Sequence, residues 1–273
     1  MDRYAVIGHP VAHSKSPLIH QAFARATGQQ MSYELLPAPL DGFVRTAQRF
    51  AADGGRGLNV TVPFKLEAYA MAKERSVRAE EAEACNTLAW RGDHWYADNT
   101  DGVGLMRDLT HNLHESLAGR DVLVLGAGGA ARGILGPLLA KAPRSVVLVN
   151  RTESRAAELA ASFAQHGPVV AMSSAQLSGR RFHVVINATS IGINGDVPEN
   201  LWPQRPFVAG GLAYDLVYAD AATPFLRWAS RQSAERTADG LGMLIEQAAE
   251  SFVLWRGVRP ETSPVFDMLR PKA

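Results

Sequence analysis

Residues 121–151 read DVLVLGAGGAARGILGPLLAKAPRSVVLVNR, and this stretch decides the fold of the chain. Two apolar runs, at 122–125 and 146–149, have the length of buried strands, and the segment between them has the length and composition of a helix. The stretch therefore predicts a strand, a glycine-rich turn, a helix and a second strand. A flavodoxin-like turn that only packs a helix on a sheet is the alternative for this pattern.

The turn at residues 126–131 reads GAGGAA and fits G-x-G-x-x-G/A. Gly126 permits the tight turn, Gly128 lets the backbone approach a pyrophosphate, and Ala131 lets the helix pack closely on the strand. The free N–H groups at the start of the helix then face the phosphates. Because a strand precedes this turn and a helix follows it, we expect a dinucleotide site rather than a structural turn.

The end of the second strand indicates which dinucleotide binds. An NAD site has Asp or Glu at about this distance to hold the ribose 2′-hydroxyl. This chain has Asn150, Arg151 and Thr152 there, with Arg155 one helical turn later. A guanidinium pairs with a 2′-phosphate, whereas a carboxylate repels it. We therefore predict NADP(H) as the cofactor; the alternative is that both arginines only lie on a solvated helix face.

The composition of the chain limits the class of protein to which it can belong and the partners it can have. Its 273 residues suggest one large or two moderate domains, and 47% hydrophobic residues suffice for a core. A formal charge of +1 gives no electrostatic reason to expect nucleic acid or an anionic membrane as partner. Apolar runs are strand-sized, and the N-terminal residues lack the features of a signal peptide. The single cysteine, Cys85, excludes an internal disulfide, and no metal site is expected. We predict a cytoplasmic protein.

The order of predicted elements indicates an α/β fold with two domains. The first hundred residues predict strands at 4–8, 31–37 and 58–62, helices at 17–27, 40–52 and 63–72, and a hairpin of 86–90 with 94–98. From Asp121, strands at 122–125, 146–149, 169–172, 183–187 and 213–217 alternate with helices, which predicts a parallel sheet covered on both faces. A helix at 240–256 follows.

We therefore expect an N-terminal α/β substrate domain at 1–101 and a Rossmann-like NADP-binding domain at 102–239. The C-terminal helices at 240–273 should return to the N-terminal domain. The chain would then cross between domains twice, with a cleft between them.

Polar side chains follow several strands of the N-terminal domain, where ligands of open α/β sheets bind. They comprise three hydroxyls, one amide, one lysine and one carboxylate. The residues are Ser14, Ser16, Thr61, Asn86, Lys65 and Asp101. Because hydroxyls both donate and accept hydrogen bonds, this set suits a polyhydroxylated small molecule.

Lys65 and Asp101 are the candidate acid–base pair. A ketone that accepts a hydride becomes an alkoxide and needs a proton, which a lysine withdrawn from water can supply. An adjacent carboxylate would orient that lysine. Taken singly, each residue also has an ordinary explanation, Lys65 as a solvated helix lysine and Asp101 as a helix cap.

Seven short motifs along the chain, taken together and in this order, closely resemble the shikimate dehydrogenases. They begin with G-x-P-V-x-H-S-x-S-P from Gly8, N-V-T-V-P-F-K from Asn59 and N-T-D-G from Asn99. They continue with G-A-G-G-A, N-R-T, N-A-T-S and G-x-x-M-L-x-x-Q-A. The resemblance covers essentially the whole chain. It implies the reversible, NADPH-dependent reduction of 3-dehydroshikimate to shikimate, a step of aromatic amino-acid biosynthesis.

The resemblance also implies roles for individual residues. Lys65 would donate and accept the proton, with Asp101 as its partner. The residues that would hold the substrate are Ser14, Ser16, Thr61, Lys65, Asn86, Asp101, Tyr218 and Gln247. Those that would hold the cofactor are Gly126, Ala127, Gly128, Gly129, Ala130, Asn150, Arg151, Thr152 and Arg155. Thr189, Leu216, Gly240 and Met243 would flank the nicotinamide.

The chain departs from the family pattern at two positions. Leu216 stands where some members have Met, and Ile191 stands where smaller residues also occur. Some relatives use quinate and NAD and tend to have an acidic residue near the adenosine ribose, which Arg151 and Thr152 argue against.

Three other functions fit parts of the pattern. A quinate or dual quinate/shikimate dehydrogenase would keep the same fold and the same Lys–Asp pair. A non-catalytic NADPH sensor would have lost Lys65 or Asp101, and a methylenetetrahydrofolate dehydrogenase-like enzyme gives no reason for Ser14 and Ser16. A monomer and a homodimer both remain open.

Overall fold

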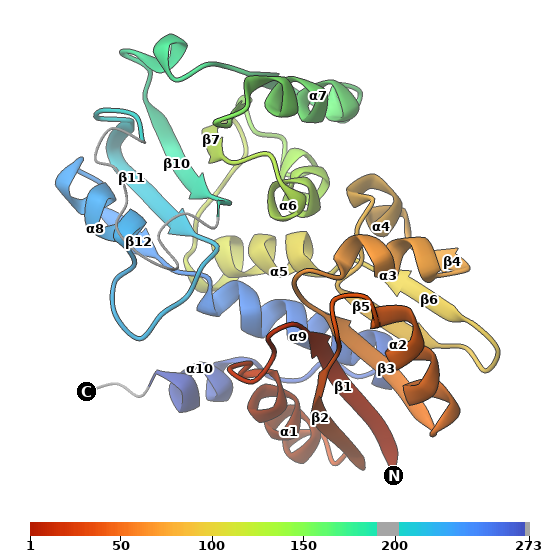
Figure 1. Cartoon of the computed structure of the whole chain (residues 1–273). Helices are drawn as coiled ribbons and strands as arrows, with labels where there is room; N and C mark the ends of the chain where they lie inside the picture. The colour runs from red at the N-terminus through yellow and green to blue at the C-terminus, as the bar shows by residue number, and fades with distance from the viewer. Residues whose placement is uncertain (190–201, 271–273) are drawn as a thin grey trace. The chain divides into compact units, whose positions relative to one another are not determined.

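The computed structural model describes residues 1–189 and 202–270, which form two compact units. Unit 1 consists of Met1–Leu105 with Leu244–Ala273, and unit 2 is Met106–Met243. The boundaries between the units fall inside two helices, α5 (Asp101–Arg107) and α9 (Leu241–Arg256) (Figure 1). Ile191, noted above as a departure from the family pattern, lies outside the described residues.

Unit 1 is built on a six-stranded mixed sheet with the order β2-β1-β3-β5-β6-β4. β1, β2 and β3 are parallel, and the hairpin of β5 and β6 follows, with β5 antiparallel to β3. The strands are β1 (Asp2–Gly8), β2 (Met31–Pro37), β3 (Gly55–Val60), β4 (Glu74–Arg75), β5 (Thr87–Trp90) and β6 (Trp95–Asp98). Ser14, Ser16, Thr61 and Lys65 thus follow β1 and β3, Asn86 directly precedes β5, and Asp101 follows β6.

The longer helices α1 and α2 of unit 1 each bury several apolar residues on one side. In α2 (Phe43–Ala52), Phe43, Ala47 and Phe50 recur at helical spacing and are buried. α1 (Ser16–Ala26) begins with Pro17 in its first turn and ends before Gly28, whose φ of 65° lies in the left-handed region. The remaining helices are α3 (Lys65–Met71), α4 (Val77–Ala82) and α10 (Ser263–Leu269).

Unit 2 is built on a six-stranded sheet in which all strands are parallel, in the order β12-β11-β10-β7-β8-β9. The strands are β7 (Asp121–Leu125), β8 (Ser145–Val149), β9 (Val169–Ala171), β10 (Phe182–Asn187), β11 (Phe207–Asp215) and β12 (Arg236–Ala238). Numbered from β7, this is the strand order of the dinucleotide-binding fold. The order reverses between β7 and β10, and ligands of such sheets bind at that point. The α/β fold class predicted from the sequence is confirmed.

The core of unit 2 follows from its apolar strands. Val122, Leu123 and Val124 of β7 are fully buried, as expected for a parallel sheet with both faces covered. α6 (Gly129–Leu139) and α7 (Glu153–Phe163) follow β7 and β8, and α8 (Pro224–Arg231) follows β11 (Figure 1). A short π-helix at Asp108–Asn112 continues α5.

Some predicted boundaries are wrong. We expected the third helix to begin at Pro63, but residues 61–64 form a turn in which Phe64 N donates to Thr61 O, and α3 begins at Lys65. β11 begins at Phe207 rather than Ala213. The strand includes Gly210 and Gly211, and such a pair of glycines in a sequence usually indicates a loop.

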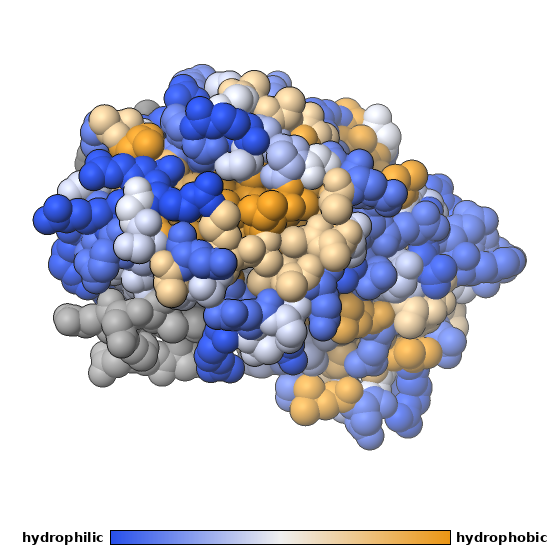
Figure 2. Space-filling view, turned by 90° about the horizontal axis from the view of Figure 1, so that it is seen from above, coloured by the Kyte–Doolittle hydropathy of each residue, from blue (hydrophilic) through white to orange (hydrophobic). Residues whose placement is uncertain are grey.

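Hydrophilic residues cover most of the face shown in Figure 2, and apolar residues gather in a smaller central area. Within the described ranges, no helix is both long enough and apolar enough to span a bilayer.

Candidate active site

Lys65 and Asp101 lie in direct contact in unit 1. Lys65 is the first residue of α3 and Asp101 the first residue of α5. Lys65 Nζ lies 2.5 Å from Asp101 Oδ2. The lysine side chain is 27% exposed and the aspartate side chain 10%, so the aspartate is the more deeply buried partner.

Asn86 holds the other side of the carboxylate. It lies directly before β5, and its Nδ2 donates to Asp101 Oδ1 at 2.8 Å. The backbone N of Asp101 donates to Asn99 Oδ1 at 3.2 Å. Asp101 is thus bound through both carboxylate oxygens and through its backbone.

Gln247 on α9 joins the same group. Its Oε1 lies 3.2 Å from Asn86 Nδ2, and its Nε2 donates to Leu244 O at 2.9 Å. Gly104 on α5 makes this close approach possible, because a Cβ at that position would lie 2.7 Å from Gln247 Cβ. A side chain at position 104 would push Gln247 away from Asn86.

Ser14 lies on the loop after β1, Ser16 is the first residue of α1, and Thr61 follows β3. Ser14 Oγ donates to Ser16 Oγ at 3.1 Å and accepts from Ser16 N at 3.2 Å. Thr61 N donates to Ile7 O at 3.0 Å. A Cβ at Gly8 would lie 2.4 Å from Thr61 Cγ2, so Gly8 allows the two loops to run side by side. The predicted substrate residues of unit 1 are therefore Ser14, Ser16, Thr61, Lys65, Asn86, Asp101 and Gln247, whereas Tyr218 belongs to unit 2.

Unit 2 contains a pocket of about 940 Å³ at the carboxyl ends of its strands. Most of the residues predicted to bind the cofactor line it: Gly126, Ala127, Gly128, Gly129, Ala130, Asn150, Arg151, Thr152, Arg155, Thr189 and Leu216. Gly240 and Met243 are not among its lining residues. The pocket lies where the strand order reverses, the position expected for a ligand in this fold.

The glycine-rich turn forms one wall of this pocket. Gly126 has a φ of 112°, and a Cβ there would lie 2.9 Å from Ala188 O, so the turn requires glycine. Among the residues that the structure describes, a Cβ at Gly128 or Gly129 would meet no atom within 4 Å apart from its own chain neighbours. Gly128 caps α6 without a side-chain hydrogen bond, so the first N–H groups of this helix face the pocket uncapped. This geometry fits a pyrophosphate.

The part of the pocket wall formed by residues 150–155, after β8, is called the rim here. It has both positively and negatively charged side chains. Arg151 and Arg155 are exposed and line the pocket, and Asn150 Nδ2 donates to Thr152 O at 2.9 Å. Glu153 lines the same rim and was not identified in the sequence. The two guanidinium groups outnumber the one carboxylate, so the rim favours an anion. Ser173 and Ser174, after β9, are further lining residues that sequence reasoning missed.

Buried hydrogen bonds tie together the ends of β10 and β11. Asn187 Nδ2 donates to Asp215 Oδ1 at 2.9 Å, and Asn187 Oδ1 accepts from Thr189 Oγ1 at 2.7 Å. Burial raises the pKa of Asp215, and a hydrogen bond of 2.5 Å from Thr223 opposes that shift. These bonds hold Thr189 at the pocket wall.

Gly240 and Met243 are held by the same unit. A Cβ at Gly240 would lie 2.2 Å from Leu216 O, so this glycine packs directly on the backbone after β11. Met243 N donates to Tyr214 Oη at 3.2 Å, and Tyr214 in turn donates to Asp108 Oδ2 at 2.7 Å. Burial raises the pKa of Tyr214 well above its usual value, so the phenol keeps its proton.

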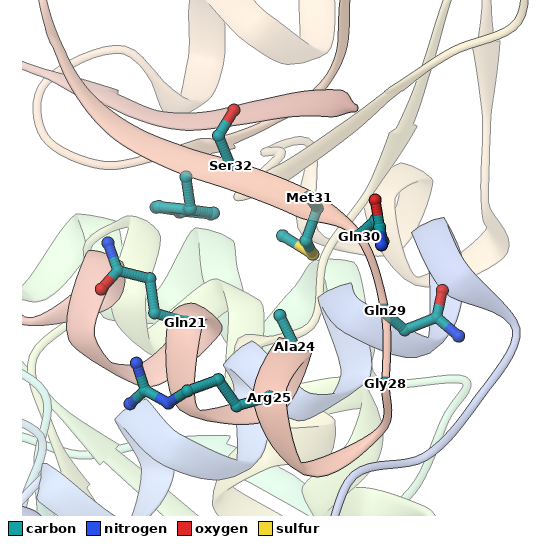
Figure 3. A pocket seen from close by; sticks show the side chains of 9 residues that line it. Gln21, Ala24, Arg25, Gly28, Gln29, Gln30, Met31 and Ser32 are labelled. Atoms are coloured by element: carbon teal, nitrogen blue, oxygen red, sulfur yellow. The ribbon is translucent and has the colours of Figure 1, made fainter.

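A second hollow, of about 550 Å³, lies between α1 and β2 (Figure 3). Gln21, Ala24 and Arg25 line it from α1, and Met31 and Ser32 line it from β2. None of the residues predicted to bind substrate or cofactor lines this hollow.

Family models match three parts of the chain. Residues 6–88 match the shikimate dehydrogenase substrate binding domain, residues 108–192 match shikimate / quinate 5-dehydrogenase, and residues 240–265 match the shikimate 5′-dehydrogenase C-terminal domain.

Individual relatives match over the full length. The chain is 55% identical over 272 residues to the shikimate dehydrogenase (NADP(+)) of Thioalkalivibrio sulfidiphilus, with 99% of each chain covered. An Ael1 enzyme from Pseudomonas putida has a TM-score of 0.90 and 45% identity, with 98% of each chain covered. The shikimate 5-dehydrogenase of Thermus thermophilus, solved in complex with NADP(H) and shikimate, has a TM-score of 0.85 and 33% identity, with 99% of each chain covered.

Proposed function

Because the chain belongs to the shikimate dehydrogenase family, we propose that it catalyses the reversible, NADPH-dependent reduction of 3-dehydroshikimate to shikimate. The contact between Lys65 and Asp101 is the observation that carries this proposal. It supports the proposal because a lysine beside a carboxylate can donate a proton, and the hydroxyl and amide groups predicted to hold the substrate suit a polyhydroxylated molecule.

Lys65 supplies the proton in this mechanism. The chemistry that the nicotinamide provides when bound is hydride transfer to the carbonyl carbon. As charge develops on the carbonyl oxygen, Lys65 Nζ donates a proton to it, and in the reverse direction Lys65 accepts the hydroxyl proton. Asp101 keeps the ammonium in place through its hydrogen bond of 2.5 Å and balances its charge.

The other polar residues of this group hold the substrate. We assign this role to Ser14, Ser16, Thr61, Asn86 and Gln247 in unit 1 and to Tyr218 in unit 2. Asn86 has a second task, because its Nδ2 already donates to Asp101. The domain at 1–101 with the C-terminal helices at 240–273 is thus the proposed substrate-binding part.

The pocket of unit 2 holds NADP(H) in this proposal. The N–H groups at the start of α6 face the pyrophosphate, and Arg151 and Arg155 pair with the 2′-phosphate. Glu153 on the same rim repels the 2′-phosphate. The preference for NADP(H) over NAD(H) therefore depends on Arg151 and Arg155. Thr189, Leu216, Gly240 and Met243 are assigned to the nicotinamide end. A cytoplasmic location and the choice between monomer and homodimer remain predictions.

One assay tests the proposal and its main alternative. The purified protein is mixed with shikimate or quinate, each with NADP+ or NAD+, and formation of reduced cofactor is followed by absorbance. We expect the highest kcat/KM with shikimate and NADP+. A higher kcat/KM with quinate would identify a quinate dehydrogenase, which the family model at residues 108–192 also includes. Absence of turnover with all four pairs would contradict the proposal.

A further inference from the structure

Behind the Lys65–Asp101 pair, unit 1 contains a continuous group of buried polar side chains. Its members come from α1, β2, β3, β5, α9 and the residue before α5, and each is at most 6% exposed. They are His20, Tyr33, Asn59, Thr87, Thr100 and Ser251. Because a buried polar group is costly unless it is hydrogen-bonded, the directions of the bonds in this group are tightly constrained.

The orientation of the Asn86 amide follows from its neighbours. The backbone N–H of Thr100 can only donate, and it lies 2.8 Å from Asn86 Oδ1. Thr87 Oγ1 donates to the same oxygen at 3.0 Å. The Nδ2 of Asn86 therefore faces the other way, toward Asp101 Oδ1. Rotation of this amide would break its bonds at both ends.

The orientation of Asn59 follows in the same way. The backbone oxygen of Asn86 can only accept, and it lies 3.3 Å from Asn59 Nδ2. Ser251 Oγ at 2.9 Å and Thr87 Oγ1 at 3.2 Å are the other acceptors within reach of the two Nδ2 hydrogens. Thr87 Oγ1 and Ser251 Oγ also lie 2.8 Å apart. Each hydroxyl has one proton, so when Ser251 donates across this contact the Thr87 proton goes to Asn86 Oδ1 at 3.0 Å.

At the end of the group farthest from Asp101, Tyr33 and His20 donate hydrogen bonds to Asn59. Tyr33 Oη lies 2.8 Å and His20 Nε2 lies 3.1 Å from Asn59 Oδ1, and this oxygen can only accept. Burial lowers the pKa of His20 to about 3 and raises the pKa of Tyr33 well above its usual value, so both are neutral at pH 7. The His20 ring stacks on Tyr33 with centroids 4.2 Å apart. Hydrogen bonds thus run from Tyr33 and His20 through Asn59 and Thr87 to Asn86 and end on Asp101.

We propose that Thr87 and Ser251, linked through Asn59, are positioning residues that keep the Asn86 amide donating to Asp101. The inference rests on the proposed function, because it assigns these residues to the Lys65–Asp101 pair. Thr87 is the critical link, since its hydroxyl both accepts from Asn59 and donates to Asn86. Loss of this hydroxyl removes one of the donors to Asn86 Oδ1, so the amide should be held less firmly and its bond to the carboxylate should weaken.

Thr87→Val tests the proposal, because valine has nearly the shape of threonine and lacks the hydroxyl. Thr87→Ser restores the hydroxyl. Thr46→Val is the matched control, because the Thr46 hydroxyl donates to Gly42 O in α2 at 2.8 Å. For each purified variant, kcat and the KM values for shikimate and NADP+ are measured together with the melting temperature. Ser251→Ala is made in parallel and decides the matter if Thr87→Val does not fold.

We expect Thr87→Val to lower kcat for shikimate about three- to tenfold, the value of one lost hydrogen bond. The KM for NADP+ should stay within about twofold of wild type, Thr87→Ser should recover kcat, and Ser251→Ala should lower kcat in the same direction. Any of three results would overturn the proposal. These are a wild-type kcat in Thr87→Val, a kcat in Thr87→Ser as low as in Thr87→Val, or an equal loss of kcat in Thr46→Val. If Thr87→Val is not folded, wild-type kcat in Ser251→Ala would overturn it. A failure of the proposed function is distinct, because the wild-type protein would then not oxidise shikimate.

Discussion

Asp101 receives Lys65 on one carboxylate oxygen, at 2.5 Å, and Asn86 on the other, at 2.8 Å. Both neighbours are donors, so the site requires a group that accepts on both sides. An ionised carboxylate meets this requirement and an amide does not.

Asp101→Asn should therefore impair the reaction although the shape of the side chain is kept. The introduced amide can accept on one side only, so its NH2 group meets either Lys65 or Asn86, which are donors as well. A hydrogen bond to a charged group contributes about 1.5–3 kcal/mol, so we expect kcat to fall roughly 10- to 100-fold. Steady-state kinetics with shikimate and NADP+ measure this. Asp53→Asn, at an exposed position paired only loosely with Arg49, is the control and should leave kcat unchanged.

Gln247→Ala should mainly raise the KM for shikimate. The side chain lies beside Asn86 and is assigned to substrate binding, and a lost hydrogen bond to an uncharged hydroxyl is worth about 0.5–1.5 kcal/mol. We expect the KM for shikimate to rise up to roughly tenfold while the KM for NADP+ stays constant. If only the KM for NADP+ changes, Gln247 has been assigned to the wrong site.

Arg151→Ala should remove most of the preference for NADP+. The guanidinium lines the rim after β8, where a charge-assisted bond to the 2′-phosphate is worth about 1.5–3 kcal/mol. The KM for NADP+ should rise roughly 10- to 100-fold, and the KM for NAD+ should barely change. Arg181→Ala, at an exposed position that does not line the pocket, is the matched control. Equal loss with both cofactors would show that Arg151 has a structural role.

His20 should make the protein less stable in mild acid. Burial lowers the pKa of His20 to about 3 in the folded state, against about 6.5 in the unfolded chain. Below pH 6.5 the unfolded chain therefore binds a proton that the folded chain does not, so folding becomes less favourable as the pH falls toward 3. Between pH 7 and pH 5 this linkage lowers the free energy of unfolding by about 2 kcal/mol.

Urea denaturation at pH 7 and pH 5 measures this effect in the wild type and in His20→Gln, which lacks the titratable ring. We expect the difference between the two pH values to be smaller in the variant by about 2 kcal/mol. The same pH dependence in both proteins would show that His20 titrates normally in the folded state.

Parts of the fold could be predicted because their sequence signals are local. The apolar runs of β7 and β8 and the turn at Gly126 lie within a few residues of one another, and the predicted segments correspond to observed elements. β12 has only three residues, Arg236–Ala238, none of them buried, so no apolar pattern indicated a strand. β4 has only two residues and α4 only six, which is too short for an apolar pattern to indicate either element.

The candidate site also shows that contacts between residues far apart in the sequence could not be predicted. Lys65 and Asp101 could be paired as candidates because each follows a predicted strand and each has a chemical role. Thr87 and Ser251 are 164 residues apart, and their hydroxyls lie 2.8 Å from each other. Ser251 stands in an apolar helix without any motif that concerns its hydroxyl, so only the packing of α9 in unit 1 brings it to Asn59. Glu153 was missed because a single carboxylate between Arg151 and Arg155 forms no binding motif in the sequence.

The turnover of Lys65→Ala with shikimate and NADP+ tests the central claim most directly. Kd for shikimate is measured by calorimetry alongside kcat, with the wild type as reference. If Lys65 transfers the proton, kcat should fall roughly 10²- to 10⁴-fold while shikimate still binds within about tenfold of the wild-type Kd. A kcat within about threefold of wild type would contradict the acid–base role of Lys65 and with it the proposed mechanism.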